Sequence, residues 1–403
     1  MAPSRGGLLA LTSLGHFVND GTTFFVPVIA ALLAYGHGIG ALEITAMLVV
    51  YYATSSFLSL YVGRWADRSG RPLELMALGM ALLGIGMIGF FVALGMLSGT
   101  SGFAAALVAS FVVGFGSAFY HPLGASILQA AFDRKSLGRA LGINGAMGSV
   151  GRALYPTLFF LVGLVITGSS SILVFAGVGL AVSLFLVPSG SFTRKPQERP
   201  PGATAGKAFT IGIVTLAIVA FIRSAANLGI VAFLPTYMQY ERPLWVGAPL
   251  GVEVTIMYVG GILGQPFFGL LANRTDVRIL LALSSVGSAL GTLAFLLVGG
   301  WPDVPLLFFI GFFTFSAFPL LMTLSAEHVD RHSTSLANSL VFGLGTGLGG
   351  TVGPLLVGIF SSGEYSHLST GFYAMVLLGL VAAAAVAAIP ASGSKSARMP
   401  LFG

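Results

Sequence analysis

Three polar residues on one turn of the first apolar run could bind and release a proton. His16, Asn19 and Asp20 are spaced i, i+3 and i+4, so a helix would place them on one face. Imidazole and carboxylate groups both exchange protons, and a carboxylate within an apolar segment is costly unless it faces a cavity or a partner. We therefore expect Asp20 to be the protonatable group, with His16 as a second one.

Three more ionisable residues lie inside apolar runs. His121 could join the proton site, although its neighbour Pro122 offers another role, since its ring could satisfy a carbonyl freed by the proline. Arg152 and Arg223 could pair with Asp20, or could together hold a carboxylate or phosphate of a substrate. A purely structural ion pair between Asp20 and Arg152 is the alternative.

Other side chains are expected to line a cavity around these groups. Asn227 follows Arg223 by four residues and would share its helix face. The remaining candidates are aromatic or polar, and the alternative for each aromatic ring is simple packing in the core. The cavity set is Asn19, Phe24, Tyr120, Arg152, Tyr155, Arg223, Asn227 and Tyr237.

The composition shows which elements must position these residues. Hydrophobic residues make up 56% of the chain and charged residues 8%, against about 25% charged in a soluble domain. Helices that cross a membrane need about 20 apolar residues, and the first such run lacks a cleavage site and is expected to be retained. The sequence predicts an all-α membrane protein with twelve spans, at residues 8–35, 41–63, 73–97, 103–130, 138–166, 170–188, 208–239, 248–272, 277–299, 305–327, 335–361 and 371–390.

The basic residues alternate from one side of these spans to the other. Sixteen of the nineteen Lys and Arg residues fall in every second connection or at a terminus, and Arg242 is alone on the opposite side. This asymmetry predicts that both termini are cytoplasmic. It also explains the net charge of +6 through contact with anionic lipid, so nucleic-acid binding is not expected. Asp67, Arg134, Arg199 and Arg331 should be cytoplasmic, and Arg242 and Glu364 external.

The chain divides into two similar halves. A Pro-, Gly- and charge-rich stretch at 189–207 is typical of a linker, which leaves six spans in 1–188 and six in 208–403. A shift of about 206–208 residues aligns Asn19 with Asn227, and a shift of 197–199 aligns Gly151 with Gly349. Because six is an even number, both halves share one orientation, and the pattern predicts a parallel repeat about an axis along the membrane normal.

The connection after the second span carries a motif, GRWADRSGRP, that resembles a signature of the major facilitator superfamily. The resemblance implies a fold of two six-helix, pseudo-symmetric halves. It also implies a cytoplasmic gate that holds the halves together in the outward-open state. We further expect Gly63 to allow a close helix approach and Asp67 to sit at a helix N-terminus. A merely basic loop is the alternative. The gate residues are Gly63, Asp67, Arg68, Gly70 and Arg71.

A narrower resemblance comes from GHFVNDG at 15–21 and GFGSAFYHPLGAS at 114–126. Both stretches are similar to the fosmidomycin-resistance-like efflux branch of the superfamily. The chain departs from that branch at Leu123, where Glu is expected, and at Arg152, which interrupts a Gly-rich stretch. The branch therefore implies efflux without naming a substrate.

Together these features predict a secondary transporter that is proton-coupled and exports a drug or metabolite by alternating access. Uptake or exchange of a small organic anion is one alternative, and a non-transporting receptor or scaffold is another. Motifs of metalloproteases, serine hydrolases and nucleotide-binding loops are missing from the sequence, and so is cysteine, which argues against an enzyme. We expect no cofactor and no metal. The expected partners are a small-molecule substrate, protons and lipid, for a monomer in the inner (plasma) membrane.

Overall fold

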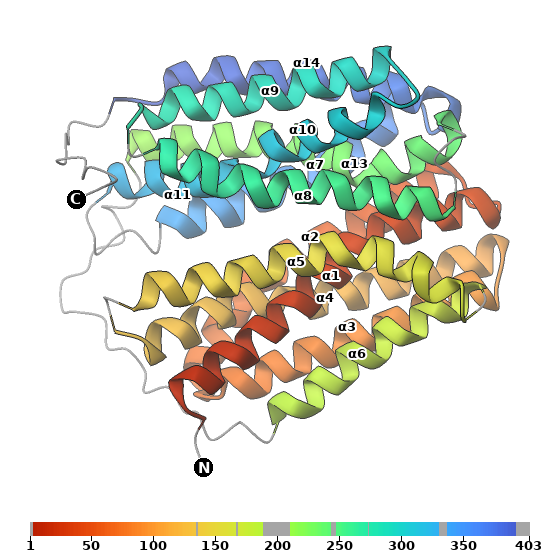
Figure 1. Ribbon diagram of the computed structural model, residues 1–403, viewed down its shortest axis with the longest axis horizontal. Coiled ribbons are helices and arrows are strands. Elements are labelled where there is room, and N and C mark those ends of the chain that lie inside the picture. The colour runs from red at the N-terminus through yellow and green to blue at the C-terminus, as the bar shows by residue number, and fades with distance from the viewer. Residues whose placement is uncertain are drawn as a thin grey trace. The chain divides into compact units, whose positions relative to one another are not determined.

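The computed structural model describes residues 3–133, 136–166, 168–187, 210–242, 247–272, 274–329 and 337–391 (Figure 1). Throughout these ranges the secondary structure is helical, as expected where a lipid-embedded backbone must satisfy its own hydrogen bonds. The side chains of Arg64, Asp67, Gly138, Ala248 and Ser339 are outside the description, although their backbone is within it.

Backbone contacts divide the chain into two compact units, and the first holds residues 1–198 together with 234–255. Within it, α1 packs against α4 and α5, and α3 against α4 and α6. A short 3-10 turn, Gly168–Ser170, precedes α6. The helices of the first half are α1 (Arg5–Gly36), α2 (Ala41–Ser69), α3 (Pro72–Gly95), α4 (Gly99–Ala131), α5 (Leu137–Gly163) and α6 (Ser171–Leu186).

The second unit holds residues 199–233 and 256–403. Here α9 packs against α10, α11 and α14, and buried aliphatic side chains fill the core between them. Its elements are α7 (Ile211–Glu241), α8 (Ala248–Leu271), α9 (Val277–Leu297), α10 (Asp303–Phe315), α11 (Ala317–Glu327), a π-helical segment (Ser339–Gly347), α13 (Leu348–Phe360) and α14 (Leu368–Ala385), with 3-10 turns at Tyr365–His367 and Val386–Ala388.

The end of α7 and the start of α8 belong to the first unit through specific hydrogen bonds. Tyr240 donates its hydroxyl to the Ala34 carbonyl at 2.8 Å, and Thr157 bonds the Gly251 carbonyl at 3.1 Å. The predicted linker 189–207 lies outside the described residues. The predicted division into 1–188 and 208–403 therefore stays a prediction.

The predicted all-helical membrane fold is confirmed, with local differences. Among the described residues, eleven helices are long and apolar enough to cross a membrane. The predicted span at 138–166 forms α5, which is 27 residues long but carries Asn144 and Arg152 and is less apolar than the others. The span at 305–327 is broken at Ser316 into α10 and α11, and the span at 335–361 begins with a π-helical segment.

The repeat appears in the packing of matching glycines. In the first unit, a Cβ at Gly151 of α5 would collide with the Phe17 carbonyl of α1. In the second unit, a Cβ at Gly349 of α13 would collide with the Phe221 carbonyl of α7. Small residues at such contacts let helix backbones approach closely within a membrane. The two glycines that align in sequence thus bring together equivalent pairs of helices.

The gate motif differs from expectation at two residues. Helix α2 runs on to Ser69 and ends where Gly70 takes a φ of 66°, so Asp67 lies in a last helical turn and its expected place at a helix N-terminus is wrong. At Gly63, an added Cβ would lie 4.0 Å from the Pro122 Cβ, an ordinary contact, so no close approach requires this glycine here. Arg71 donates to Glu74 at 3.3 Å.

Candidate functional site

The polar face of α1 is buried in the first unit. Asn19 is 0% and Asp20 1% exposed, and His16 lies one turn earlier on the same face. The helical spacing of these residues brings them together, as the sequence predicts. A carboxylate buried in this way needs charged or hydrogen-bonding partners, because an isolated buried charge is strongly unfavourable.

Asp20 finds its cationic partner on α5. Arg152 donates from Nη2 to Asp20 Oδ2 at 2.7 Å, a charge-assisted hydrogen bond. Asn19 donates from Nδ2 to the other carboxylate oxygen, Oδ1, at 3.1 Å. The Arg152 guanidinium also lies over the Phe24 ring, 4.3 Å from its centroid. Of the two arginines considered from sequence, the structure therefore brings Arg152 to Asp20.

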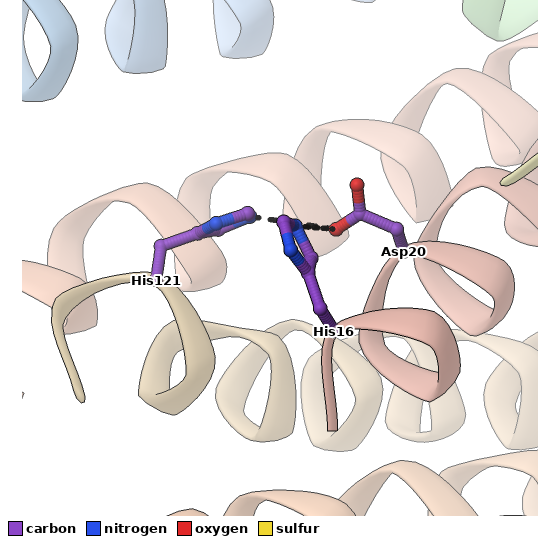
Figure 2. A group of neighbouring side chains, drawn as sticks. All are labelled: His16, Asp20 and His121. Carbon is purple, nitrogen blue, oxygen red and sulfur yellow. Dashed lines mark ion pairs between the residues drawn. The ribbon is translucent and has the colours of Figure 1, made fainter. Parts of the chain in front are cut away.

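Two histidines converge on Asp20 from α1 and α4 (Figure 2). His16 Nε2 lies 3.5 Å and His121 Nε2 3.6 Å from the same oxygen, Asp20 Oδ1. The side chain of His16 is 13% exposed and that of His121 is 62% exposed. The buried carboxylate is thus connected through His121 to a more accessible surface.

This cluster also has the residue types of a metal site, and the charge of Arg152 bears on whether a metal ion could bind there. One ligand atom from each of His16, Asp20 and His121 lies within 4.8 Å of the others. The Arg152 guanidinium already occupies Asp20 Oδ2 at 2.7 Å. A divalent ion would then face a cation across one carboxylate, and like charges at this range repel strongly in a partly buried site. A proton adds less charge than a divalent ion and would meet less repulsion from Arg152.

Asn144 of α5, which was not among the candidates from the sequence, supports the rings of Tyr120 and His16. Asn144 of α5 accepts from the Tyr120 hydroxyl at 2.9 Å through its side-chain oxygen, and Tyr120 also reaches the Thr12 carbonyl at 3.0 Å. Asn144 precedes Arg152 by eight residues, with Gly148 between them at i+4. This spacing puts all three on one helix face. The periodicity would have identified Asn144, which is 6% exposed.

The other predicted aromatic residues lie in packing positions. Tyr155 is 1% exposed, and its ring contacts Phe17 and Phe175 at centroid distances of 5.7 and 4.8 Å. Tyr237 is 3% exposed, and its ring centroid lies 5.6 Å from the Arg242 guanidinium carbon. Phe24 and Tyr120 are the two aromatic candidates that contact the charged cluster.

Arg223 lies in the second unit among neutral partners. Its Nη2 donates to the carbonyls of Phe313 and Thr314, at 2.9 and 3.1 Å. Its Nε donates to Ser285 at 3.2 Å, and the side chain is buried. These carbonyls belong to the C-terminal end of α10, where the chain breaks at Ser316 and where the helix dipole favours a cation. No carboxylate in the described part of the chain pairs with Arg223.

Asn227, one turn after Arg223, is also buried in the second unit. Its Oδ1 accepts from the Thr314 hydroxyl at 3.4 Å, while its Nδ2 has no partner among the described residues. The structure thus keeps Arg223 and Asn227 close together, as their spacing predicts. Their role in binding a substrate stays a prediction.

Comparison with known proteins agrees with this architecture. The family model described as Major Facilitator Superfamily matches residues 12–250 and 216–398. The Fosmidomycin resistance protein of Escherichia coli (strain K12) is 24% identical over 374 residues, which cover 88% of this chain and 86% of that protein. The sequence-based resemblance to this branch is consistent with that similarity.

Two solved structures share the fold at low sequence identity. A bacterial homologue of the human lysosomal transporter Spinster, in an inward-facing and occupied conformation, has a TM-score of 0.76 at 16% identity and covers 96% of this chain and 97% of its own. A variant of the nucleoside transporter NupG has a TM-score of 0.75 at 15% identity and covers 95% of this chain and 99% of its own. At these identities the similarity extends to the fold alone.

Proposed function

Because this chain belongs to the Major Facilitator Superfamily and is a multi-pass membrane transporter rather than an enzyme, we propose that it is a proton-coupled exporter of a small organic molecule. The observation that carries the proposal is the buried Asp20 carboxylate, which Arg152 neutralises at 2.7 Å while two histidines face its other oxygen. Ionisable residues inside membrane segments are characteristic of proton pathways.

The coupling follows from the charge balance of this pair. With Asp20 ionised, its negative charge is matched by Arg152. Protonation of Asp20 removes that negative charge and leaves Arg152 without its carboxylate partner. The two protonation states of Asp20 therefore differ in the electrostatic energy of the Asp20–Arg152 pair. A proton that binds from one side of the membrane can in this way change which conformation is favoured.

Export is favoured by the similarity to the Fosmidomycin resistance protein, whose name associates it with resistance to that compound. The substrate cavity would be lined by the predicted set around Asn19, Phe24 and Tyr120 in the first unit. Asn227 and Tyr237 extend the proposed lining, whereas the bonds from Arg223 to the Phe313 and Thr314 carbonyls favour a structural role for that predicted cavity residue. We propose a drug or metabolite as the exported molecule.

Proton-coupled uptake or exchange of a small organic anion is the second candidate, and the exposed part of Arg152 favours it. The Arg152 side chain is 15% exposed, and protonation of Asp20 would remove the carboxylate charge opposite its guanidinium, which favours pairing with a carboxylate or phosphate of a substrate. Proton and anion would then bind together and move in the same direction. A cationic substrate would instead compete with the proton for Asp20 and move in the opposite direction.

The gate and the topology belong to the same proposal. Gly63, Asp67, Arg68, Gly70 and Arg71 would form the cytoplasmic gate of a monomer in the plasma membrane, with both termini cytoplasmic. Because the chain has no cysteine, single-Cys variants can be labelled from outside with an impermeant thiol reagent. Labelling of Glu364→Cys but not Arg199→Cys in intact cells is expected, and the reverse pattern would refute the orientation.

Flux measurements in proteoliposomes test the proposed function directly. Fosmidomycin and the amphiphilic cation ethidium are suitable first probes, each with an imposed pH gradient and with the gradient collapsed by a protonophore. Export coupled to protons predicts accumulation against a probe gradient only while the pH gradient is present. If the flux of every transported probe is the same with and without the pH gradient, proton coupling is excluded. Net movement of probe and proton in the same direction would favour the anion alternative.

A further inference from the structure

The ring of His16 is held against α5 by its Nδ1 atom. That nitrogen lies 2.8 Å from the backbone carbonyl oxygen of Asn144 and 3.1 Å from the Oδ1 of the same residue. A carbonyl oxygen only accepts hydrogen bonds, so Nδ1 must carry the hydrogen. Nδ1 carries the hydrogen whichever way the Asn144 side-chain amide is turned, because the backbone carbonyl oxygen is an acceptor in both cases.

The tautomer fixed in this way determines what the other ring nitrogen does. When Nδ1 carries the only hydrogen of a neutral imidazole, Nε2 has a free lone pair. This lone pair is directed at Asp20 Oδ1, 3.5 Å away. A lone pair and an ionised carboxylate oxygen repel each other, whereas a proton on either atom makes the contact favourable. The His16–Asp20 pair is therefore built to hold one proton.

Two neighbours set the position of the imidazole ring. A Cβ at Gly148 would collide with Cδ2 and Nε2 of His16, so the ring lies in a notch that only a glycine on α5 leaves open. On the other side the ring stacks on Tyr120 with a centroid distance of 4.5 Å and an interplanar angle of 26°. Tyr120 in turn donates to Asn144 Oδ1. The notch and the stack leave the ring little freedom to turn away from Asp20.

We propose that His16 Nε2 is the atom that receives the coupling proton from Asp20, and that Gly148 and Asn144 are the positioning residues that hold His16 in the tautomer required. This inference rests on the proposed proton coupling and deepens it. The proton carrier is then the His16–Asp20 pair of α1, and α5 sets the geometry of that pair.

The proposed step needs no other reactant. The O–H bond of protonated Asp20 breaks and an N–H bond forms at His16 Nε2, so Asp20 regains its charge and its pairing with Arg152. The resulting imidazolium keeps its Nδ1–H bond to the Asn144 carbonyl. The 3.5 Å gap slightly exceeds hydrogen-bond length, so the transfer requires a small approach of ring and carboxylate. The titratable or charged groups facing His16 are Asp20 from α1, Tyr120 and His121 from α4, and Arg152 from α5.

The first test fills the notch beside the His16 ring and leaves every polar group in place. Gly148→Ala should displace the His16 ring and abolish the response of fosmidomycin flux to a pH gradient, and the variant should still fold because the added Cβ meets a side chain and not the backbone of α1. Gly145→Ala on the same helix is the matched control, since an added Cβ there meets no atom within 4 Å. His16→Gln should lose the response as well, because an amide cannot carry the proton.

The second test observes the imidazole directly and needs no substrate. Nitrogen NMR of protein labelled at its histidines distinguishes protonated from unprotonated ring nitrogens, and His16→Gln identifies the His16 signals among the six histidines. We expect Nδ1 of His16 to stay protonated throughout a pH titration, with only Nε2 changing. Asp20→Asn and Gly148→Ala should both alter that titration, and Gly145→Ala should not.

The outcomes separate this inference from the proposed function. A neutral His16 protonated at Nε2, or identical His16 spectra in Gly148→Ala and Gly145→Ala, would overturn the inference even if proton-coupled flux is observed. If no probe responds to the pH gradient while the His16 signals behave as expected, the proposed coupling fails and the tautomer assignment stands. A folded Gly148→Ala with a normal gradient response would refute the positioning role.

Discussion

Helices α1 and α7 start the two repeated halves and carry asparagines that align in sequence, Asn19 and Asn227, yet their polar clusters work differently. On α1 the asparagine is followed by Asp20, whose charge is matched by the Arg152 side chain. On α7 it is followed by Leu228, and the nearby charge is the Arg223 cation. One half thus holds a buried negative charge paired with a side-chain cation, and the other holds a positive charge bound to backbone carbonyls.

The difference lies in what neutralises each charge. Asp20 meets side chains that can themselves gain, lose or move charge, namely Arg152, His16 and His121. Arg223 meets backbone carbonyls at the end of α10, and these cannot titrate or move without disturbing the helix. A repeated backbone can therefore carry a switch in one half and a structural anchor in the other, because the partners decide the chemistry.

The largest effect is expected from Asp20→Asn. The amide keeps the shape of the carboxylate but cannot exchange a proton, so pH-gradient-driven accumulation in proteoliposomes should be lost while the protein still folds. The double variant Asp20→Asn, Arg152→Gln also removes the cation that has lost its carboxylate partner, and it controls for any loss of stability. A normal gradient response in a folded Asp20→Asn protein would show that Asp20 only forms a structural ion pair. Asp20 and Arg223 would then both be structural.

The shared backbone of the two halves is tested by Gly151→Ala and Gly349→Ala. Each new Cβ would meet a carbonyl of the facing helix, which cannot yield as a side chain can. Both variants should lower stability by about 1–3 kcal/mol, to a similar extent, in thermal unfolding followed by scanning fluorimetry. Gly142→Ala, which meets no atom within 4 Å, is the control. A large loss in one half only would show that the packing is not equivalent.

Arg223→Ala should reduce stability more than it changes transport. The variant leaves the Phe313 and Thr314 carbonyls without their donor, which should lower stability by about 1–3 kcal/mol. Arg223→Lys keeps the charge but loses the planar guanidinium that donates to several acceptors at once, so an intermediate melting temperature is expected. If Arg223→Ala keeps the wild-type melting temperature and loses binding of a small carboxylate such as benzoate, Arg223 is a substrate ligand and the contrast fails.

The smallest effect is expected at the gate, where the first half carries Asp67 and the degenerate second copy carries Asn273, which lies outside the described residues. Asp67→Asn makes the two copies alike and should shift the population towards the inward-open state, because the gate loses a charge. Spin labels on Ser69→Cys and Asn338→Cys report the distance between the two helix ends that are proposed to be cytoplasmic. Unchanged distances would argue against a gating role.

The order of the helices and the polar face of α1 could be predicted from the sequence. Both depend on local patterns, since the length of an apolar run fixes a span and the i, i+3, i+4 spacing fixes a face. The expected helix N-terminus at Asp67 was wrong because a motif does not show where its helix ends. Gly70, with a φ of 66°, ends α2 beyond Asp67. The break at Ser316 lies beside the Phe313 and Thr314 carbonyls that Arg223 of α7 binds, a contact that no local pattern shows.

By itself the sequence determined that the chain is a helical membrane protein with repeated halves and that Asp20, Arg152 and Arg223 lie inside its spans. Only the tertiary structure decided that Arg152, and not Arg223, pairs with Asp20, and that the Asn144 carbonyl fixes the hydrogen on His16. The physical reason is that spacing along one helix sets which residues share a face, whereas the partner of a buried charge is set by which helices pack together and how closely. Here glycines at 148 and 151 of α5 allow the approach to α1 that brings those groups into contact.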